Sequence, residues 1–170
     1  MRKIISIILI MCLFPLICSA QTQKSKSFTC KVKVAVSGSD NIKGEIKSFI
    51  SRGLRSLGDV IVTDNNPDWL LSIVELETST KNGYKSEVTL SVVILVPYDN
   101  KYILNEVSEE SKKYISLSTS DLYSFKEHWL RVCSSEDLRN LCNGIVADFD
   151  TEYIKYARNI WQIYLDYQKK

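Results

Sequence analysis

Histidine is the scarcest chemically versatile residue here, because the 170-residue chain contains only one, His128. A single histidine excludes the histidine pairs and the two-histidine facial triads on which many metal sites depend. The cysteines form no Cys-x-x-Cys pair and no cluster with His128, which argues against a zinc site. The sequence therefore predicts no metal site and no cofactor.

Glycine and proline are also few, with six and three residues. Gly38 stands between a predicted strand and a predicted helix, where a phosphate-binding loop would sit. Neither glycine-rich signature, G-x-G-x-x-G or G-x-x-x-x-G-K-[ST], is present there. We interpret Gly38 as ordinary loop chemistry, which argues against nucleotide binding.

The N-terminal segment has the pattern of a bacterial export signal. Arg2 and Lys3 precede the apolar run Ile4–Ile17, and Cys18-Ser19-Ala20 offers a small-x-small cleavage site after Ala20. The apolar run is shorter than the roughly 20 residues that span a membrane. We predict a signal peptide at residues 1–20, a periplasmic or secreted protein, and no integral membrane span after cleavage.

A lipoprotein anchored through Cys18 is the alternative, which we favour less because Ile17 is not the small residue expected just before a lipidated cysteine. Residues 21–27 are polar and predict a flexible tail. Cleavage removes two of the 22 basic residues and none of the 20 acidic ones, so the mature chain carries no net charge. Neutrality argues against a nucleic-acid partner.

The strongest structural signal is the stretch Trp69–Val96, in which Asn82-Gly83 separates two runs rich in β-branched and aromatic residues. This dipeptide favours a two-residue type I′ hairpin turn, which sets Lys81 opposite Tyr84 and Trp69 opposite Val96. The half of the hairpin away from the turn is apolar, whereas the half near the turn is polar. We expect the polar half to project into solvent and to expose the partner-binding candidates Glu75, Glu77, Lys81, Tyr84 and Lys85.

Other elements follow from hydrophobic periodicity. Alternation predicts a strand at Phe28–Val36, apolar residues at helical spacing predict a helix over Asp40–Leu57, and a short strand follows at Asp59–Thr63. Later predicted strands are Tyr102–Val107, Tyr114–Leu117 and Tyr123–Val132, with the charged run Ser108–Lys113 as a solvated turn.

The C-terminal stretch predicts a long helix that starts near Ser135 and carries two apolar stripes. A continuous helix to Gln168 would be about 50 Å long, which exceeds the diameter of a domain of this size. We favour a break near Asp148–Thr151. The alternative is a projecting, tyrosine-rich end, including Tyr164 and Tyr167, that binds a partner or forms an oligomer.

Three cysteines remain after cleavage. Cys133 and Cys142 are separated by about two helical turns, too far for a bridge. Cys30 on an inward strand face could pair with Cys142 on an inward helix face, and three buried thiols are an equally weighted alternative.

Two weak sets of catalytic candidates are present. Glu75 and Glu77 on one strand face would place carboxylates roughly 7 Å apart, near the separation in inverting glycosidases. His128 could serve a Ser-His-Asp site with Ser124 and Asp121, although no G-x-S-x-G elbow supports it. For both sets, a solvated strand surface is the interpretation we favour.

The fold predicted for residues 28–170 is a single α+β domain, a two-layer sandwich. A mostly antiparallel sheet, begun by a β-α-β unit and continued by the long hairpin and further strands, packs against one central and one C-terminal amphipathic helix. The order of elements over Phe28–Val96 resembles the small α/β modules of bacterial envelope assemblies, such as the N-terminal domain of the Tol-system propeller protein.

The absence of a clustered catalytic motif, beside a surplus of amphipathic surface, favours a non-enzyme. We predict an exported binding or assembly module of the bacterial cell envelope, whose partner is another envelope or secreted protein. The alternatives are a small secreted hydrolase that uses the paired carboxylates or His128, and a secreted inhibitor or immunity-type protein.

Overall fold

The computed structural model describes residues 27–79 and 85–169. Its sheet has the strand order β2-β1-β3-β4-β5. The strands are β1 (Cys30–Ser37), β2 (Val60–Val62), β3 (Trp69–Ser79), β4 (Lys85–Pro97) and β5 (Tyr123–Cys133). The helices are α2 (Asp40–Ser56), α3 (Lys101–Asn105), α4 (Glu109–Thr119), α5 (Leu138–Phe149) and α6 (Lys155–Gln168), with a 3-10 turn at Ser135–Asp137 and a π-helical turn at Asp150–Ile154. The predicted signal peptide, most of the predicted tail and the Asn82-Gly83 turn lie outside the described residues.

The sheet combines a parallel and an antiparallel half. The β1-α2-β2 unit makes β1 and β2 parallel, and β1 also pairs in parallel with β3. The longer ladders, β3 with β4 and β4 with β5, are antiparallel. Leu70 lies opposite Leu95 and Thr78 opposite Glu87, which is the register predicted for the hairpin, until a shift after Thr78 places Ser79 opposite Lys85.

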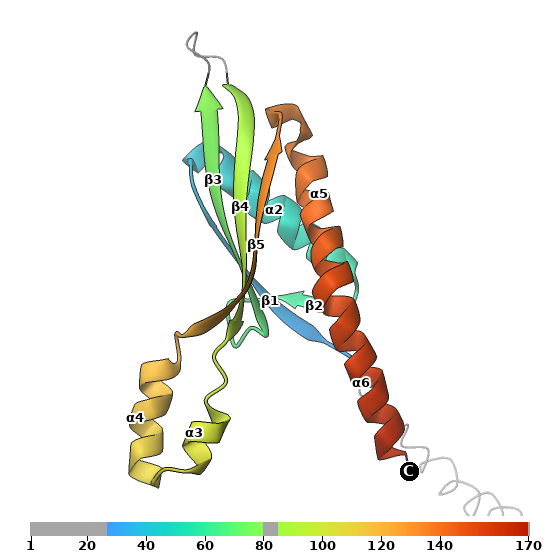
Figure 1. The fold of residues 1–170 in the computed structure, drawn as a ribbon. Coiled ribbons are helices and arrows are strands. Elements are labelled where there is room, and N and C mark those ends of the chain that lie inside the picture. Colours follow the sequence, from blue (N-terminus) through green and yellow to red (C-terminus); the bar gives the residue numbers. More distant parts are fainter. Residues whose placement is uncertain (1–26, 80–84, 170) are drawn as a thin grey trace, which may run out of the picture.

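One face of the sheet is covered by α2 and α5, as Figure 1 shows. Ile46, Ile50 and Leu54 of α2 are fully buried against this face. The Trp69 ring and the Phe149 ring of α5 meet in a T-shaped contact, with centroids 5.8 Å apart. The predicted fold class, an α+β two-layer sandwich packed by a central and a C-terminal helix, is confirmed.

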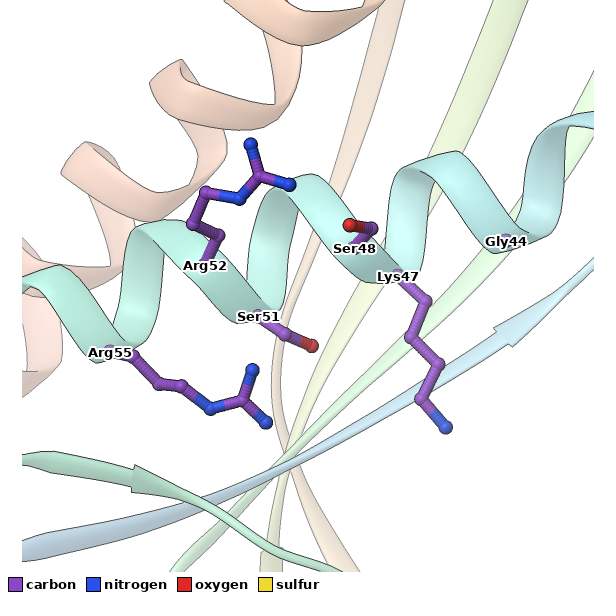
Figure 2. A pocket seen from close by; sticks show the side chains of 6 residues that line it. All are labelled: Gly44, Lys47, Ser48, Ser51, Arg52 and Arg55. Atoms are coloured by element: carbon purple, nitrogen blue, oxygen red, sulfur yellow. The ribbon is translucent and has the colours of Figure 1, made fainter.

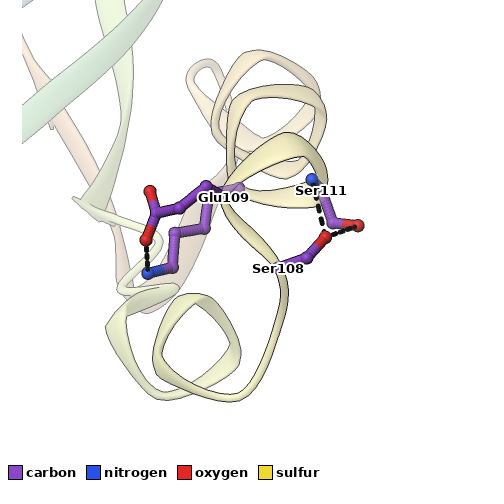
Figure 3. A network of polar contacts seen from close by, with 4 residues as sticks. Ser108, Glu109 and Ser111 are labelled. Atoms are coloured by element: carbon purple, nitrogen blue, oxygen red, sulfur yellow. Dashed lines mark hydrogen bonds and ion pairs between the residues drawn. The ribbon is translucent and has the colours of Figure 1, made fainter.

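The segment between β4 and β5 is helical, so the strands predicted at residues 102–107 and 114–117 are wrong. Ser108 caps α4, since its side chain accepts a hydrogen bond from the Ser111 backbone N–H (Figure 3). Glu109 then stands in the first turn and accepts a bond from Lys112, 2.5 Å away. The charged run interpreted as a turn is therefore a helix start, because it supplies both a cap and acids that favour the positive end of the helix dipole.

The C-terminal helical stretch does not break, which makes the favoured break wrong. The chain keeps helical φ and ψ angles at Phe149 and Lys155 and changes only to the wider π-helical turn between them. The five-residue repeat of this turn brings Phe149 and Ile154 to the same side, and both are fully buried. The continuous stretch Leu138–Gln168 is about 46 Å long and α6 continues beyond the sheet (Figure 1).

The described cysteines are all free thiols, so the Cys30–Cys142 bridge is wrong and the alternative of buried thiols is the one observed for this pair. Burial raises the pKa of both thiols to about 12. Both therefore remain protonated at neutral pH and pack as small apolar side chains in the core.

Candidate functional site

Glu75 is buried, with only 3% of its surface exposed, so its predicted exposure as a partner-binding residue is wrong. Its Oε2 accepts a hydrogen bond of 2.7 Å from the Ser39 backbone N–H, at the start of α2. The loop residue Gly38 has φ +144 and lies so close that a Cβ there would be 2.4 Å from Oε2. Glu75 thus fastens β3 to the positive end of α2, which stabilises a carboxylate.

This placement removes Glu75 from the proposed carboxylate pair on a solvated strand. The backbone of Glu77 continues β3 and that of Lys85 begins β4. Lys81 and Tyr84 lie outside the described residues. The predicted partner-binding role of the hairpin's outer half therefore stays a prediction for its remaining members.

A different pair of carboxylates does come together, which the sequence did not reveal because the residues are 25 positions apart. Glu127 of β5 accepts a hydrogen bond from the Tyr153 hydroxyl, and this bond lowers the pKa of Glu127. Loss of solvent and the nearby Glu127 carboxylate raise the pKa of Glu152. Glu127 is half-buried and Glu152 is exposed, and neither lines the hollows described below on α2 and α5.

His128 lies exposed on β5, and its Nε2 is 2.9 Å from the Ser91 hydroxyl on β4. Ser91, rather than Ser124, is thus the hydroxyl residue beside the imidazole. Among residues 27–79 and 85–169 no carboxylate bonds to the other ring nitrogen, so this part of the chain presents a serine–histidine pair without the third group that orients a catalytic histidine.

An organised apolar surface lies on α6, which has no buried residue. Five side chains at spacings of four, three, one and three residues lie within a 100° arc of this helix. We call them the α6 stripe, and their exposed fractions are Tyr156 66%, Ile160 50%, Ile163 69%, Tyr164 49% and Tyr167 75%. Tyr164 also stacks against Trp161, with ring centroids 5.6 Å apart. Of the residues on this stripe, Ile163 was missed by sequence reasoning, although the same helical spacing identifies it.

The start of α6 is held to the rest of the fold by Arg158. Its Nε lies 2.5 Å from Oδ2 of Asp59, and its Nη2 lies 2.9 Å from Oδ1 of the same residue. Its Nη1 lies 2.7 Å from Oδ1 of Asp150. The hydrogen bonds from Arg158 lower the pKa of Asp59. This clamp fixes the direction of the helix, so the stripe beyond it is presented on a rigid element.

A second apolar surface is the sheet face opposite α2 and α5, which we call the outer sheet face. Its exposed members on β3 and β5 include Leu76 at 60% and Leu130 at 61%. The antiparallel pairing of β3, β4 and β5 places these side chains on one face with Ser91 and His128.

No protein-family model and no curated protein matches this chain. Solved structures that match part of this chain include a PelC dodecamer and its variant from Paraburkholderia phytofirmans. The variant is 14% identical with a TM-score of 0.38, over 69% of this chain and 84% of that one. The other PelC dodecamer is 15% identical with a TM-score of 0.36, over 72% and 86%.

The rare lipoprotein B from Shewanella oneidensis is 10% identical with a TM-score of 0.33, covering 76% of this chain and 98% of that one. Identities and TM-scores this low assign neither a family nor a function to the chain.

Within the described part of the chain, no group of three potential ligands gathers that could hold a metal ion. No helix in residues 27–79 and 85–169 is long and apolar enough to cross a membrane. What the described structure does present is apolar surface on rigid elements, an arrangement suited to binding other molecules.

Proposed function

We propose that this protein is an exported, non-catalytic assembly module of the bacterial cell envelope that self-associates through the α6 stripe. The observation that carries the proposal is the exposure of five large apolar side chains on one face of a helix that continues past the sheet (Figure 1). Contiguous exposed apolar surface of this kind is typical of interaction sites. Export rests on the N-terminal signal pattern.

A second copy of the chain fits this surface in chemistry and size. The stripe carries no charge, so two stripes can meet without electrostatic repulsion, and a two-fold axis would bring the same residues together. If each large side chain offers about 200 Å², the exposed fractions amount to about 600 Å² per copy. Two copies would bury about 1,200 Å², the lower end of the range for specific interfaces.

Replacing Ile160 and Ile163 by lysine tests this proposal. Both side chains are at least half exposed, so the change leaves the core intact and circular dichroism should remain that of the wild type. Two charges on each stripe would repel across the interface, and we expect the dissociation constant to rise at least about tenfold. Sedimentation equilibrium at several concentrations measures it.

The control places lysine at Gln162 and Asp166, two exposed positions on the side of α6 away from the stripe. We expect this variant to associate like the wild type. A wild-type protein that stays monomeric at its highest soluble concentration would reject self-association and leave the stripe to a different partner. Equal association of both variants would place the interface elsewhere.

A further inference from the structure

A basic hollow lies on α2, away from the α6 stripe. It has a volume of about 480 Å³ and is lined by Gly44, Lys47, Ser48, Ser51, Arg52 and Arg55. The small residues Gly44, Ser48 and Ser51 leave the space, and the three cations border it. Lys47, Ser51 and Arg55 project to one side of the helix and Arg52 to the other (Figure 2). Helical spacing sets Lys47 and Arg55 about 12 Å apart along the axis.

A neighbouring hollow of about 190 Å³ extends the basic surface toward α5. Arg52 borders both hollows, and Arg139 of α5 lines the second one. The Arg139 guanidinium lies 5.8 Å from the centre of the Phe49 ring, which holds it in place. Lys47, Arg52, Arg55 and Arg139 thus form one continuous cationic surface, which we call the basic surface.

Among the residues that the structure describes, none of the four cations of the basic surface forms an ion pair. Within the described residues Arg131 pairs with Asp148, and Arg158 pairs with Asp59 and Asp150. The arginines of this part of the chain that make no ion pair are Arg52, Arg55 and Arg139. Like charges that are neighbours on a helix repel, so a bound anion would relieve a strain that the fold leaves in place.

From this clustering we infer that the basic surface binds a phosphoryl oxyanion, either free or on a lipid headgroup. A carboxylate is satisfied by one guanidinium fork, whereas a phosphoryl group brings up to two charges and three acceptor oxygens. Arg55 and Lys47 project to the same side of α2 and offer a guanidinium fork and an ammonium to such oxygens, while Arg52 on the other side adds to the local positive charge (Figure 2). Ser51 is 6% exposed, and its hydroxyl makes no hydrogen bond within the described residues, so it is available to the ligand.

The zero net charge of the mature sequence is compatible with this inference. Neutrality is a sum over the surface, and it does not prevent one helix face from carrying a local excess of cations. The inference concerns a different surface from the α6 stripe, so either can fail without the other.

Isothermal titration of the purified protein with pyrophosphate at low ionic strength tests the inference. The variant Lys47→Gln/Arg52→Gln/Arg55→Gln changes only exposed side chains, so it should fold normally. We expect it to bind pyrophosphate at least about tenfold more weakly than the wild type. The control removes three exposed cations elsewhere and should bind like the wild type: Lys113→Gln, Lys126→Gln and Lys155→Gln.

Co-sedimentation with vesicles distinguishes the source of the phosphoryl group. A lipid headgroup is identified if the wild type binds vesicles of phosphatidylcholine with phosphatidylglycerol but not vesicles of phosphatidylcholine alone. The Lys47→Gln/Arg52→Gln/Arg55→Gln variant must also lose this binding. Pyrophosphate binding without vesicle binding would identify a free phosphoryl group. No binding in either arm, or equal binding by both triple variants, would overturn the inference.

Discussion

Replacing Gly38 by alanine should strongly destabilise the fold, because this glycine permits the contact between β3 and the start of α2. Its φ of +144 disfavours any side chain, and an added Cβ would lie 2.8 Å from the Glu75 Cβ and 2.9 Å from the Glu75 backbone oxygen. Neither atom can move without shifting β3. Backbone strain and overpacking together should lower the free energy of unfolding by roughly 3 kcal/mol.

Urea unfolding followed by circular dichroism measures this loss, and Gly44→Ala is the matched control. Gly44 lies within α2 with nothing within 4 Å of an added Cβ, so alanine there should stabilise by about 0.5–1 kcal/mol. Glycine-to-alanine substitution has the same effect on the unfolded chain at both positions. A loss of stability at Gly38 beside a gain at Gly44 would therefore isolate the effect of the close contact between Gly38 and Glu75. A Gly38→Ala midpoint equal to that of the wild type would refute the reasoning.

The Glu75 side chain provides a second check on the same contact. Glu75→Ala removes the acceptor for the Ser39 N–H and should cost about 2–3 kcal/mol. It also removes Oε2, the atom closest to the Cβ that Gly38→Ala adds. The Cβ and the backbone oxygen of residue 75 remain, and both are still too close to the added Cβ. The double variant should therefore lose less stability than the sum of the single variants.

Two further predictions concern groups in the clamp and the core. Asp59→Asn should lower the free energy of unfolding by about 1–2 kcal/mol at pH 7, because it weakens the pair with Arg158. Since the pKa of Asp59 is lower in the folded protein, the stability difference between the wild type and Asp59→Asn should shrink as pH falls through the carboxyl range near 4. The control is Asp64→Asn, in the exposed turn. A stability difference that does not change with pH would contradict the ion-pair explanation. Cys30 and Cys142 should resist a thiol reagent at pH 8 in the native protein and react only after unfolding, because burial raises their pKa values to about 12. Fast labelling of either thiol in the folded state would show that burial does not protect them.

The sheet was largely predictable, because its signals are local. Strict alternation and the Asn-Gly dipeptide were enough to set the register of β3 and β4, which the structure confirms from Leu70 to Thr78. The run Ser108–Lys113 was ambiguous because serine and acidic residues favour both turns and helix N-termini. There the local capping by Ser108 decided for a helix.

The carboxylates show the limit of pattern reasoning. Alternation correctly places Glu75 on the same strand face as Leu71 and Ile73, yet only the packing of the α2 start over β3 makes that position buried. Similarly, Glu127 and Glu152 become neighbours because the π-helical turn lies beside β5. Such neighbours cannot be found from spacing along the chain.

The sequence by itself determined the strands that form the sheet, the amphipathic helix α2 and most of the apolar stripe of α6, because hydrophobic periodicity acts over a few residues. Tertiary structure alone decided which surfaces were left uncovered. The Arg158 clamp and the buried Phe149 and Ile154 keep the C-terminal helix continuous, so its stripe continues past the sheet instead of folding back. The basic surface depends equally on packing, since it requires α5 to bring Arg139 beside α2.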